Sequence, residues 1–481
     1  MKKRLAKLCS LVLAGAMVLS GCGASGEEST DPVTGEEKSE QSEETTSADA
    51  DKEGKETVRV LIPGLSEQST IDPVSGLETK SLGELQEYMN QVIPDYNIEV
   101  KTVAWDGWIQ SLEAMISSGE IDIGIYTNQE AIPGWYMDLT EYLSSDEEVN
   151  LDNLKEWYLD SAVDYLYYKS FNHPEATGNI YGLPISIACN IITYDSQLFE
   201  EWGVEEPSSD MTFSDLIDLC EQMTGTNPVT GKQNYGGYLF STWMEWYALC
   251  YDAVKPYKDE SGTMDINAFD TEEYIEYIKT SEEVRKWASD MIRLVDCCNP
   301  AVASGSGAEN WLTEENDIAI MFDCNSHTRD YMSYVYAGDE EITGRYKTLM
   351  IPAGTYGESF PEFYHYGITQ NCNNADAAWE VLKFMCTDKE FIDFYLSNYA
   401  AEKISCLNDT EGMEIMSYDL NKERHAYQTE HLFVTDDYWN WRTAMQTVDN
   451  QILSKEYTVD EAVDALYKGV SDWVNNVKTQ Q

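Results

Sequence analysis

Aromatic rings and planar polar groups are the most informative side chains of this 481-residue chain, which contains 13 Trp and 32 Tyr. A sugar presents a face of C–H bonds that packs on an aromatic ring, and a rim of hydroxyl groups that needs hydrogen-bond donors and acceptors. Trp, Tyr, Asp and Asn meet both needs without any net-charge requirement. Core packing or hinge support is the alternative role for each candidate. The candidates are Trp105, Tyr126 and Asn128 in an expected first lobe, Asn190 at a hinge, and Trp243, Trp246, Asp323, Tyr364, Tyr366 and Trp439 in a second lobe.

Catalytic and metal-binding patterns give no comparable signal. Among 87 acidic residues, carboxylate pairs suited to glycoside hydrolysis occur anywhere, so their presence decides nothing. The stretch 225–233 has five residues between its glycines, where a phosphate-binding loop needs four. We therefore expect no cofactor, no metal and no catalysis, with a surface glycan hydrolase or lyase as the enzyme alternative. No metal-ligand spacing links the five histidines, which are His173, His327, His365, His425 and His431.

The charge balance is strongly acidic. Lys and Arg number 31 against 87 Asp and Glu, which gives a net charge of −56. Such a surface repels phosphate groups, so nucleic acid is not an expected partner. A hydrophobic content of 42% and a length of 481 residues allow two lobes with cores of their own.

The first 22 residues predict export. Lys2, Lys3, Arg4 and Lys7 precede an apolar run from Leu8 to Leu19, which is too short to span a bilayer as a helix. The next residues, Ser20-Gly21-Cys22, complete a segment that resembles a bacterial lipobox. That resemblance implies removal of residues 1–21 and lipidation of Cys22, which would be the protein's only attachment to the membrane. An ordinary secretory signal with an incidental cysteine is the alternative.

Residues 22–56 are expected to be an acidic, disordered tether. From Gly23 to Glu56 there are 12 acidic residues, three lysines and no aromatic residue, so the segment cannot bury enough apolar surface to fold. The tether would let the folded body stand away from the membrane.

Nine of the 11 cysteines lie beyond Cys22, and an odd number cannot pair completely within one chain. Several occupy apolar helical positions, where a free thiol packs as a small hydrophobic group. We expect most of them to be reduced core residues: Cys189, Cys220, Cys250, Cys297, Cys298, Cys324, Cys372, Cys386 and Cys406.

Apolar periodicity after Thr57 predicts alternating strands and helices. Strands are expected near 58–62, 98–100 and 121–125, with helices over 82–92 and 108–116 between them. This order favours a parallel sheet with right-handed crossovers. Ligands of such sheets bind beyond the carboxyl ends of the strands. Gly64, Trp105 and the segment 126–128 are expected at those ends.

The stretch from Tyr181 to Thr224 predicts a buried strand followed by two helices. Asp195 is expected to cap a helix that runs to Trp202 and ends at Gly203. Thr212 and Asp215 have the spacing of a capping box at the start of the next helix.

These residues, in this order, resemble a segment of the family 1 extracellular solute-binding proteins, which are the carbohydrate-binding subunits of ABC importers. The matching pieces are Tyr181 to Pro184, Tyr194-Asp195, Leu198-Phe199, Gly203 and Thr212 to Leu216, with Phe213 in place of the usual Trp. The Ala377 to Lys383 helix and the Arg442-Thr443-Ala444 run are similar to later family segments, the latter to maltodextrin-binding members.

The resemblance implies an α/β, two-lobed, periplasmic-binding-protein-like (type 2) fold with hinge strands and a central ligand cleft. We assign 57–188 and 366–430 to lobe 1, and 189–365 and 431–481 to lobe 2. The implied protein is a monomer, lipid-anchored at the extracellular face of the bacterial cytoplasmic membrane. It would capture a sugar or oligosaccharide and deliver it to an ABC importer permease. A glycan adhesin or sensor without transport is a further alternative.

Overall fold

The computed structural model describes residues within the range 54–480. The gaps in this range are 72–77, 106, 127–133, 169–173, 177, 189–190, 240–243, 254–271, 323–325, 353, 355–362, 401–402 and 414–437. The signal, Cys22 and all but the last residues of the expected tether lie outside the described residues. Over the described part, no helix combines the length and hydropathy needed to cross a membrane.

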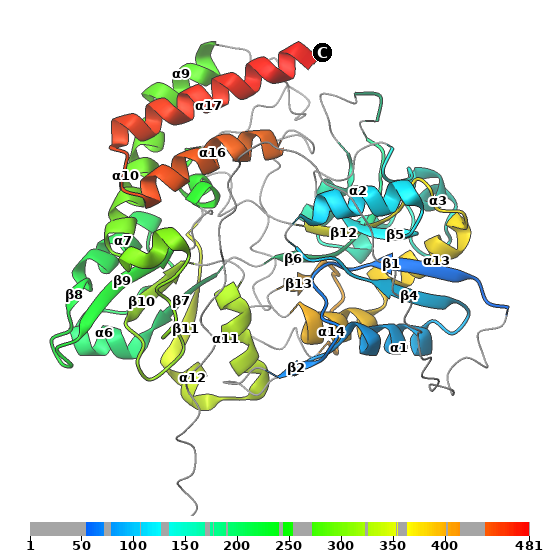
Figure 1. Cartoon of the computed structure of the whole chain (residues 1–481), viewed down its shortest axis with the longest axis horizontal. Helices are drawn as coiled ribbons and strands as arrows, with labels where there is room; N and C mark the ends of the chain where they lie inside the picture. Colours follow the sequence, from blue (N-terminus) through cyan, green and yellow to red (C-terminus); the bar gives the residue numbers. More distant parts are fainter. Residues whose placement is uncertain are drawn as a thin grey trace, which may run out of the picture. The chain divides into compact units, whose positions relative to one another are not determined.

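The first sheet has six strands in the order β13-β6-β12-β5-β1-β4 (Figure 1). Strand β1 pairs in parallel with β4 and β5, which confirms the predicted β-α-β-α-β unit. Strand β12 runs antiparallel between β5 and β6. The bounds are β1 (Thr57–Leu61), β4 (Asn97–Lys101), β5 (Ile123–Tyr126), β6 (Leu183–Ala188), β12 (Phe363–Ile368) and β13 (Lys403–Ser405).

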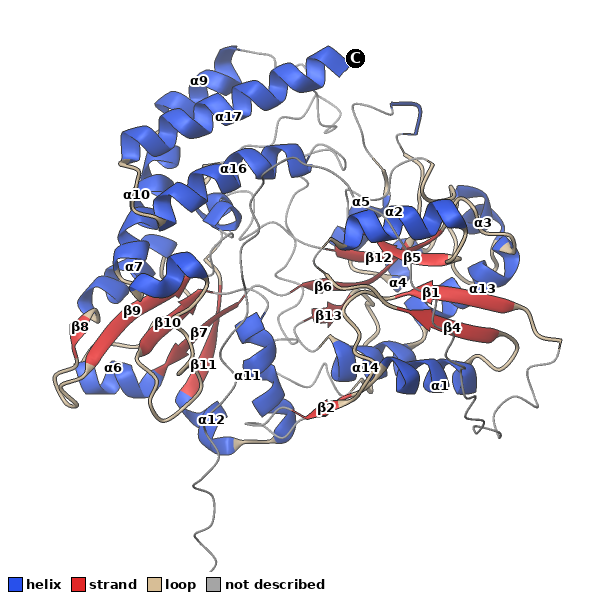
Figure 2. Cartoon of the chain, viewed as in Figure 1, coloured by secondary structure: helices blue, strands red, loops and turns tan. Residues whose placement is uncertain are grey.

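Helices cover both faces of this sheet (Figure 2). On one face, Leu85 and Met89 of α1 (Leu82–Val92) join the core that contains Val58 and Val60. On the other, α2 (Trp108–Ser118) packs with Leu61 in a second cluster. Helices α13 (Ala375–Thr387) and α14 (Lys389–Tyr399) complete the first face, and a short hairpin, β2 (Thr70–Ile71) and β3 (Glu78–Thr79), precedes α1.

The aromatic segment 151–168 does not form one continuous helix. Helices α4 (Leu154–Trp157) and α5 (Asp160–Leu166) flank Tyr158, whose backbone is extended at φ −124° and ψ 158°. The Tyr158 hydroxyl donates a hydrogen bond to the Cys386 carbonyl oxygen at 3.2 Å. This buried tertiary contact accompanies the helix break, and local periodicity does not report it. Helix α3 (Thr140–Ser145) and a 3-10 turn, η1 (Pro174–Ala176), lie nearby in the sequence.

The second sheet has the order β11-β7-β10-β9-β8. Its central strand is the fully buried β10 (Ile318–Phe322), which is parallel to β9 (Gln233–Leu239) and antiparallel to β7 (Ile191–Asp195). The outer strands are β8 (Gly225–Thr226) and β11 (Tyr346–Met350). The predicted helix starts are confirmed: Asp195 caps α6 (Ser196–Trp202), which ends at Gly203, and Thr212 and Asp215 form the capping box of α7 (Phe213–Gln222).

Further helices complete the second lobe. Two consecutive helices, α9 (Glu272–Thr280) and α10 (Glu282–Asp296), are separated at Ser281, whose hydroxyl caps the second helix by accepting the Val284 N–H at 3.0 Å. Helices α16 (Tyr438–Leu453) and α17 (Val459–Gln480) pack beside α10 (Figure 1). The remaining elements are η2 (Met244–Tyr251), η3 (Pro300–Ser304), α11 (Ser326–Ala337) and α12 (Glu340–Arg345).

Two segments carry the chain between the sheets. The first leads from β6 to β7, within the stretch that starts at Tyr181. The second leads from β11 back to β12. Because β12 begins at Phe363, the expected lobe boundary at 365/366 falls inside this strand. Tyr364 and Tyr366 therefore both belong to the first sheet. Their listing among the second-lobe candidates was wrong, although the expected bounds 366–430 place Tyr366 in lobe 1.

The seven described cysteines are all free thiols, as expected. Five are buried: Cys220, Cys297, Cys298, Cys386 and Cys406. Burial raises the pKa of Cys220, Cys297, Cys298 and Cys386 above the ordinary value of a thiol, and it raises the pKa of the half-buried Cys372 to about 11. The first four thiols are therefore protonated core groups at neutral pH.

Candidate functional site

The best-defined candidate site lies at one edge of the first sheet. Strands β1 and β4 are parallel, so their carboxyl ends reach the same edge. The chain segments that follow them are tied together, because Ile62 N–H donates to the Lys101 carbonyl at 2.9 Å and Gly64 N–H donates to the Val103 carbonyl at 2.8 Å. These bonds fix the course of the loop that carries Trp105.

Gly64 makes room for the Trp105 ring. Its φ of +81° lies in the left-handed region, and a Cβ atom at this position would stand 2.2 Å from Trp105 Nε1. The indole therefore rests against the backbone at the end of β1. Its side chain is still 44% exposed, which makes it one of the three large exposed apolar residues among those described.

Tyr364 brings a second ring to this edge. Strand β12 runs antiparallel to β5, so its amino-terminal end lies where β5 ends. The rings of Tyr364 and Trp105 meet edge to face, with centroids 6.4 Å apart and planes at 79°. Trp108, the first residue of α2, makes a similar contact with Trp105 at 5.5 Å and 77°. Trp105 is thus held on two sides by aromatic neighbours.

Lys403 supplies a cation to the same group. It is the first residue of β13 and pairs with Ala188 at the carboxyl end of β6. Its Nζ lies 3.8 Å from the centroid of the Tyr364 ring and 5.6 Å from that of Trp105. Among the described lysine and arginine residues, Lys403 alone is buried, at 6% exposure. We call Trp105, Tyr364 and Lys403 the edge cluster.

The edge cluster combines an open aromatic face with a nearby ammonium group. An indole face can take the C–H face of a sugar ring, and an ammonium group can donate hydrogen bonds to hydroxyl oxygens. Chemistry of this kind suits reversible binding. Within the described residues, no group of three His, Cys, Asp or Glu side chains could hold a metal ion.

Tyr126 and Tyr366 lie behind the cluster in the core. Their exposures are 4% and 0%, and burial raises the pKa of each hydroxyl. The Tyr126 ring stacks on His365 with centroids 5.0 Å apart. A Cβ atom on Gly182 or Gly367 would lie 2.6 or 3.2 Å from the Tyr126 ring, so this ring fills space that two glycines leave open. In this structure both tyrosines pack as core residues, and ligand contact by either stays a prediction.

The predicted second-lobe contacts are only partly placed. Asn128, Asn190, Trp243 and Asp323 lie outside the described residues. Trp246 falls in η2 and Trp439 in α16, but the described part of the structure does not include their side chains. Strands β9 and β10 are parallel and end in register at Leu239 and Phe322. Trp243 and Asp323 therefore follow two strands that end at one edge, and they stay predictions.

Lys403 is the member that sequence reasoning missed. One sequence signal could have identified it: a lysine directly precedes Ile404 in a chain that has nearly three times as many acidic as basic residues. Its pairing with β6 and its position over Tyr364 depend on contacts between distant segments, so spacing alone does not reveal them.

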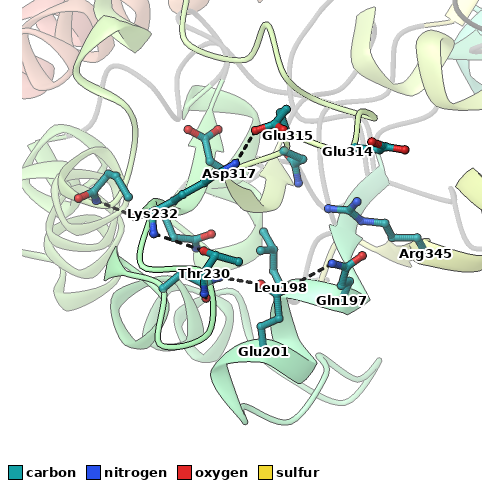
Figure 3. A pocket seen from close by; sticks show the side chains of 13 residues that line it. Gln197, Leu198, Glu201, Thr230, Lys232, Glu314, Glu315, Asp317 and Arg345 are labelled. Carbon is teal, nitrogen blue, oxygen red and sulfur yellow. Dashed lines mark hydrogen bonds and ion pairs between the residues drawn. The ribbon is translucent and has the colours of Figure 1, made fainter.

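A small polar pocket opens at the other edge of the second sheet, near the starts of β9 and β10 (Figure 3). No aromatic side chain lines it, and its volume of about 80 Å³ is below the range of ordinary small-molecule sites. Its charged groups also pair with protein partners, as Lys232 does with Glu315 at 2.5 Å and Arg345 with Asp195 at 2.5 Å. This pocket does not suit a sugar.

Comparison with known proteins gives a consistent assignment. Residues 76–390 match the family described as bacterial extracellular solute-binding protein. A Brucella abortus protein described as a binding protein is 23% identical over 304 residues, which are 61% of this chain and 65% of the relative. The chain thus spans less than two thirds of that relative's length.

Solved structures share the two-lobed fold of periplasmic sugar-binding proteins. An ABC substrate-binding protein of Listeria monocytogenes, in complex with cycloalternan, aligns with a TM-score of 0.61 at 16% identity, covering 88% of this chain and 98% of the other. The GacH receptor of Streptomyces glaucescens, solved unliganded and with acarbose, aligns with a TM-score of 0.63 at 15% identity, covering 88% and 100%. The family match extends over more than half of the residues, so this chain belongs to the bacterial extracellular solute-binding proteins.

Proposed function

We propose that this protein is a lipid-anchored solute-binding protein that captures a sugar or oligosaccharide between its two lobes and delivers it to the permease of an ABC importer. The observation that carries this proposal is the edge cluster, in which a partly exposed indole stands beside Tyr364 and the ammonium group of Lys403. The family membership and the fold shared with sugar-binding and polyol-binding proteins support it.

The mechanism we propose is capture by closure, as in periplasmic binding proteins generally. A ligand that touches both lobes only in the closed form shifts the open and closed populations by its differential affinity for the two. The first-lobe contacts would come from the edge cluster. Trp243, Trp246, Asp323 and Trp439 are our proposed second-lobe contacts. The permease would then recognise the closed form, and no bond is made or broken.

A thermal-shift screen with mono- and oligosaccharides, followed by calorimetry, tests carbohydrate binding. A ligand that binds only the native state raises apparent stability by about 2.7 kcal/mol when its concentration is 100 times the dissociation constant. Recovery of the bound glycan unchanged after long incubation supports a binding protein. Cleavage products from pure protein would instead establish the hydrolase or lyase alternative.

Replacing Trp243 and Trp246 with alanine tests the second-lobe assignment. We expect binding of the sugar found in the screen to be lost, because two stacking surfaces disappear. A dissociation constant equal to that of the wild type would reject these two residues as contacts.

Cys22→Ser tests the proposed anchor. Without the thiol that carries the lipid, the protein should leave the membrane fraction and appear in the medium. A variant that still sediments with membranes would show that attachment does not depend on Cys22.

A further inference from the structure

We propose that Lys403 is a positioning residue for the stacking surface of Trp105. In this view its ammonium group fixes the Tyr364 and Trp105 rings relative to each other before any ligand arrives, and thereby sets the affinity for a sugar ring. The affinity part rests on the proposed carbohydrate function, whereas the positioning part concerns the unliganded protein alone.

The backbone of Lys403 is well anchored. It pairs with Ala188 at the end of β6, and its N–H donates to the Ala400 carbonyl at 2.9 Å. The side chain carries Nζ to 3.8 Å from the Tyr364 ring centroid, within the range of a cation–π contact. Because the residue is 6% exposed, water competes little for this contact, and cation–π attraction is stronger where water is excluded.

Trp105 is held less firmly in place than Lys403. It lies in the loop after β4 and is 44% exposed. Its described ring contacts are with Tyr364, Trp108 and the ammonium group of Lys403, together with the close approach to Gly64. Lys403 lies within 6 Å of both ring centroids, so it links the buried Tyr364 to the exposed Trp105. Because the backbone of Lys403 belongs to the sheet, its ammonium group restrains the Trp105 indole from that side.

A restrained ring binds better than a mobile one. Each side chain that must be immobilised on binding weakens the affinity by roughly two- to twelvefold. If Lys403 immobilises Trp105 beforehand, the ligand does not bear this penalty. Loss of the ammonium group should therefore weaken sugar binding by a factor in that range.

Fluorine NMR of the unliganded protein labelled with 5-fluorotryptophan tests the positioning directly. The Trp105 resonance is identified by its loss in Trp105→Phe. In Lys403→Met we expect this resonance to shift and broaden, whereas Lys403→Arg, which keeps the cation, should retain its position. Lys155→Met is the matched control, because Lys155 is an exposed first-lobe lysine in an ion pair with Asp164. It should leave the resonance unchanged.

A Trp105 resonance in folded Lys403→Met that matches the wild type would overturn the proposal. If Lys403→Met does not fold, Lys403→Gln gives a second test, since it removes the positive charge but keeps a polar side chain and leaves the Tyr364 ring in place. The same shift and broadening is expected there, and an unchanged resonance would again overturn the proposal.

Calorimetry with maltose and maltotriose tests the consequence for affinity. For a probe that binds the wild type, Lys403→Met should raise the dissociation constant by roughly two- to twelvefold and Lys155→Met should not. Equal affinities of Lys403→Met and the wild type would refute the effect on binding. If a wider sugar panel also fails to bind the wild type, the carbohydrate function and the affinity part fall together. The fluorine spectra still decide the positioning part.

Discussion

Gly64→Ala is the sharpest single perturbation of the edge cluster. The new Cβ would stand 2.2 Å from Trp105 Nε1 and 2.7 Å from Cδ1, so the indole has to move. In addition, a side chain at φ +81° is strained by about 1–2 kcal/mol. Displacing the indole also removes its edge-to-face contact with Tyr364, which is worth about 0.5–1.5 kcal/mol.

These magnitudes predict two separate effects. The free energy of unfolding should fall by about 1.5–3.5 kcal/mol in urea denaturation. A displaced indole must be immobilised again when a sugar binds, which costs about 0.5–1.5 kcal/mol. The dissociation constant for the sugar identified by screening should therefore rise by roughly two- to twelvefold.

Gly119→Ala is the matched control. Gly119 ends α2 at φ +70°, and an added Cβ there meets no atom within 4 Å. It should therefore reproduce the backbone strain, about 1–2 kcal/mol of stability, and leave the dissociation constant unchanged. If folded Gly64→Ala binds the sugar as tightly as Gly119→Ala does, Trp105 is not a ligand contact and the reasoning fails.

Two further predictions concern buried ionisable side chains, Asp195 and His365. Asp195→Asn should lower the free energy of unfolding by about 3 kcal/mol, since Asp195 is fully buried and accepts a hydrogen bond from Arg345 Nε at 2.9 Å. Glu206→Gln is the control, because Glu206 forms an exposed ion pair with Lys347. In the same denaturation assay it should lower the free energy of unfolding by at most about 1 kcal/mol. Burial lowers the pKa of His365 from 6.5 to about 3, so the unfolded chain binds more protons below pH 6.5 and stability falls as the pH drops from there towards 3. At 1.36 kcal/mol per pH unit, this loss reaches about 2 kcal/mol at pH 5. His365→Phe should not show this loss of stability. If the free energies of unfolding of the wild type and His365→Phe change equally between pH 7 and pH 5 in urea denaturation, His365 is not the cause of the pH dependence.

Local sequence patterns correctly predicted the helices and strands that depend on residues close by in the sequence. The caps at Asp195 and Thr212 depend on residues within three positions, and both form as expected. The parallel pairing of β1 with β4 and β5 follows from apolar alternation and the handedness of crossovers.

Features that depend on distant partners were not predictable in this way. Tyr364 was placed in the wrong lobe because its strand is defined by pairing with β5 and β6, more than 150 residues away in the sequence. The break at Tyr158 involves the carbonyl of Cys386, and the burial of Lys403 depends on β6 and on the Tyr364 ring. Nothing in the immediate sequence around these residues encodes such contacts.

The position of Tyr364 also joins ligand contact to lobe movement. It is the second residue of β12, the strand that the chain enters directly after its return crossing from β11. Trp105 and Lys403 touch this ring, so all three members of the edge cluster meet at the end of a crossing segment. Under the proposed function, a sugar stacked on Trp105 would also act on Tyr364, which lies near the start of the strand that follows the crossing. Ligand binding at the first lobe and the open-to-closed equilibrium would then be coupled directly through Tyr364, without a longer chain of residue contacts.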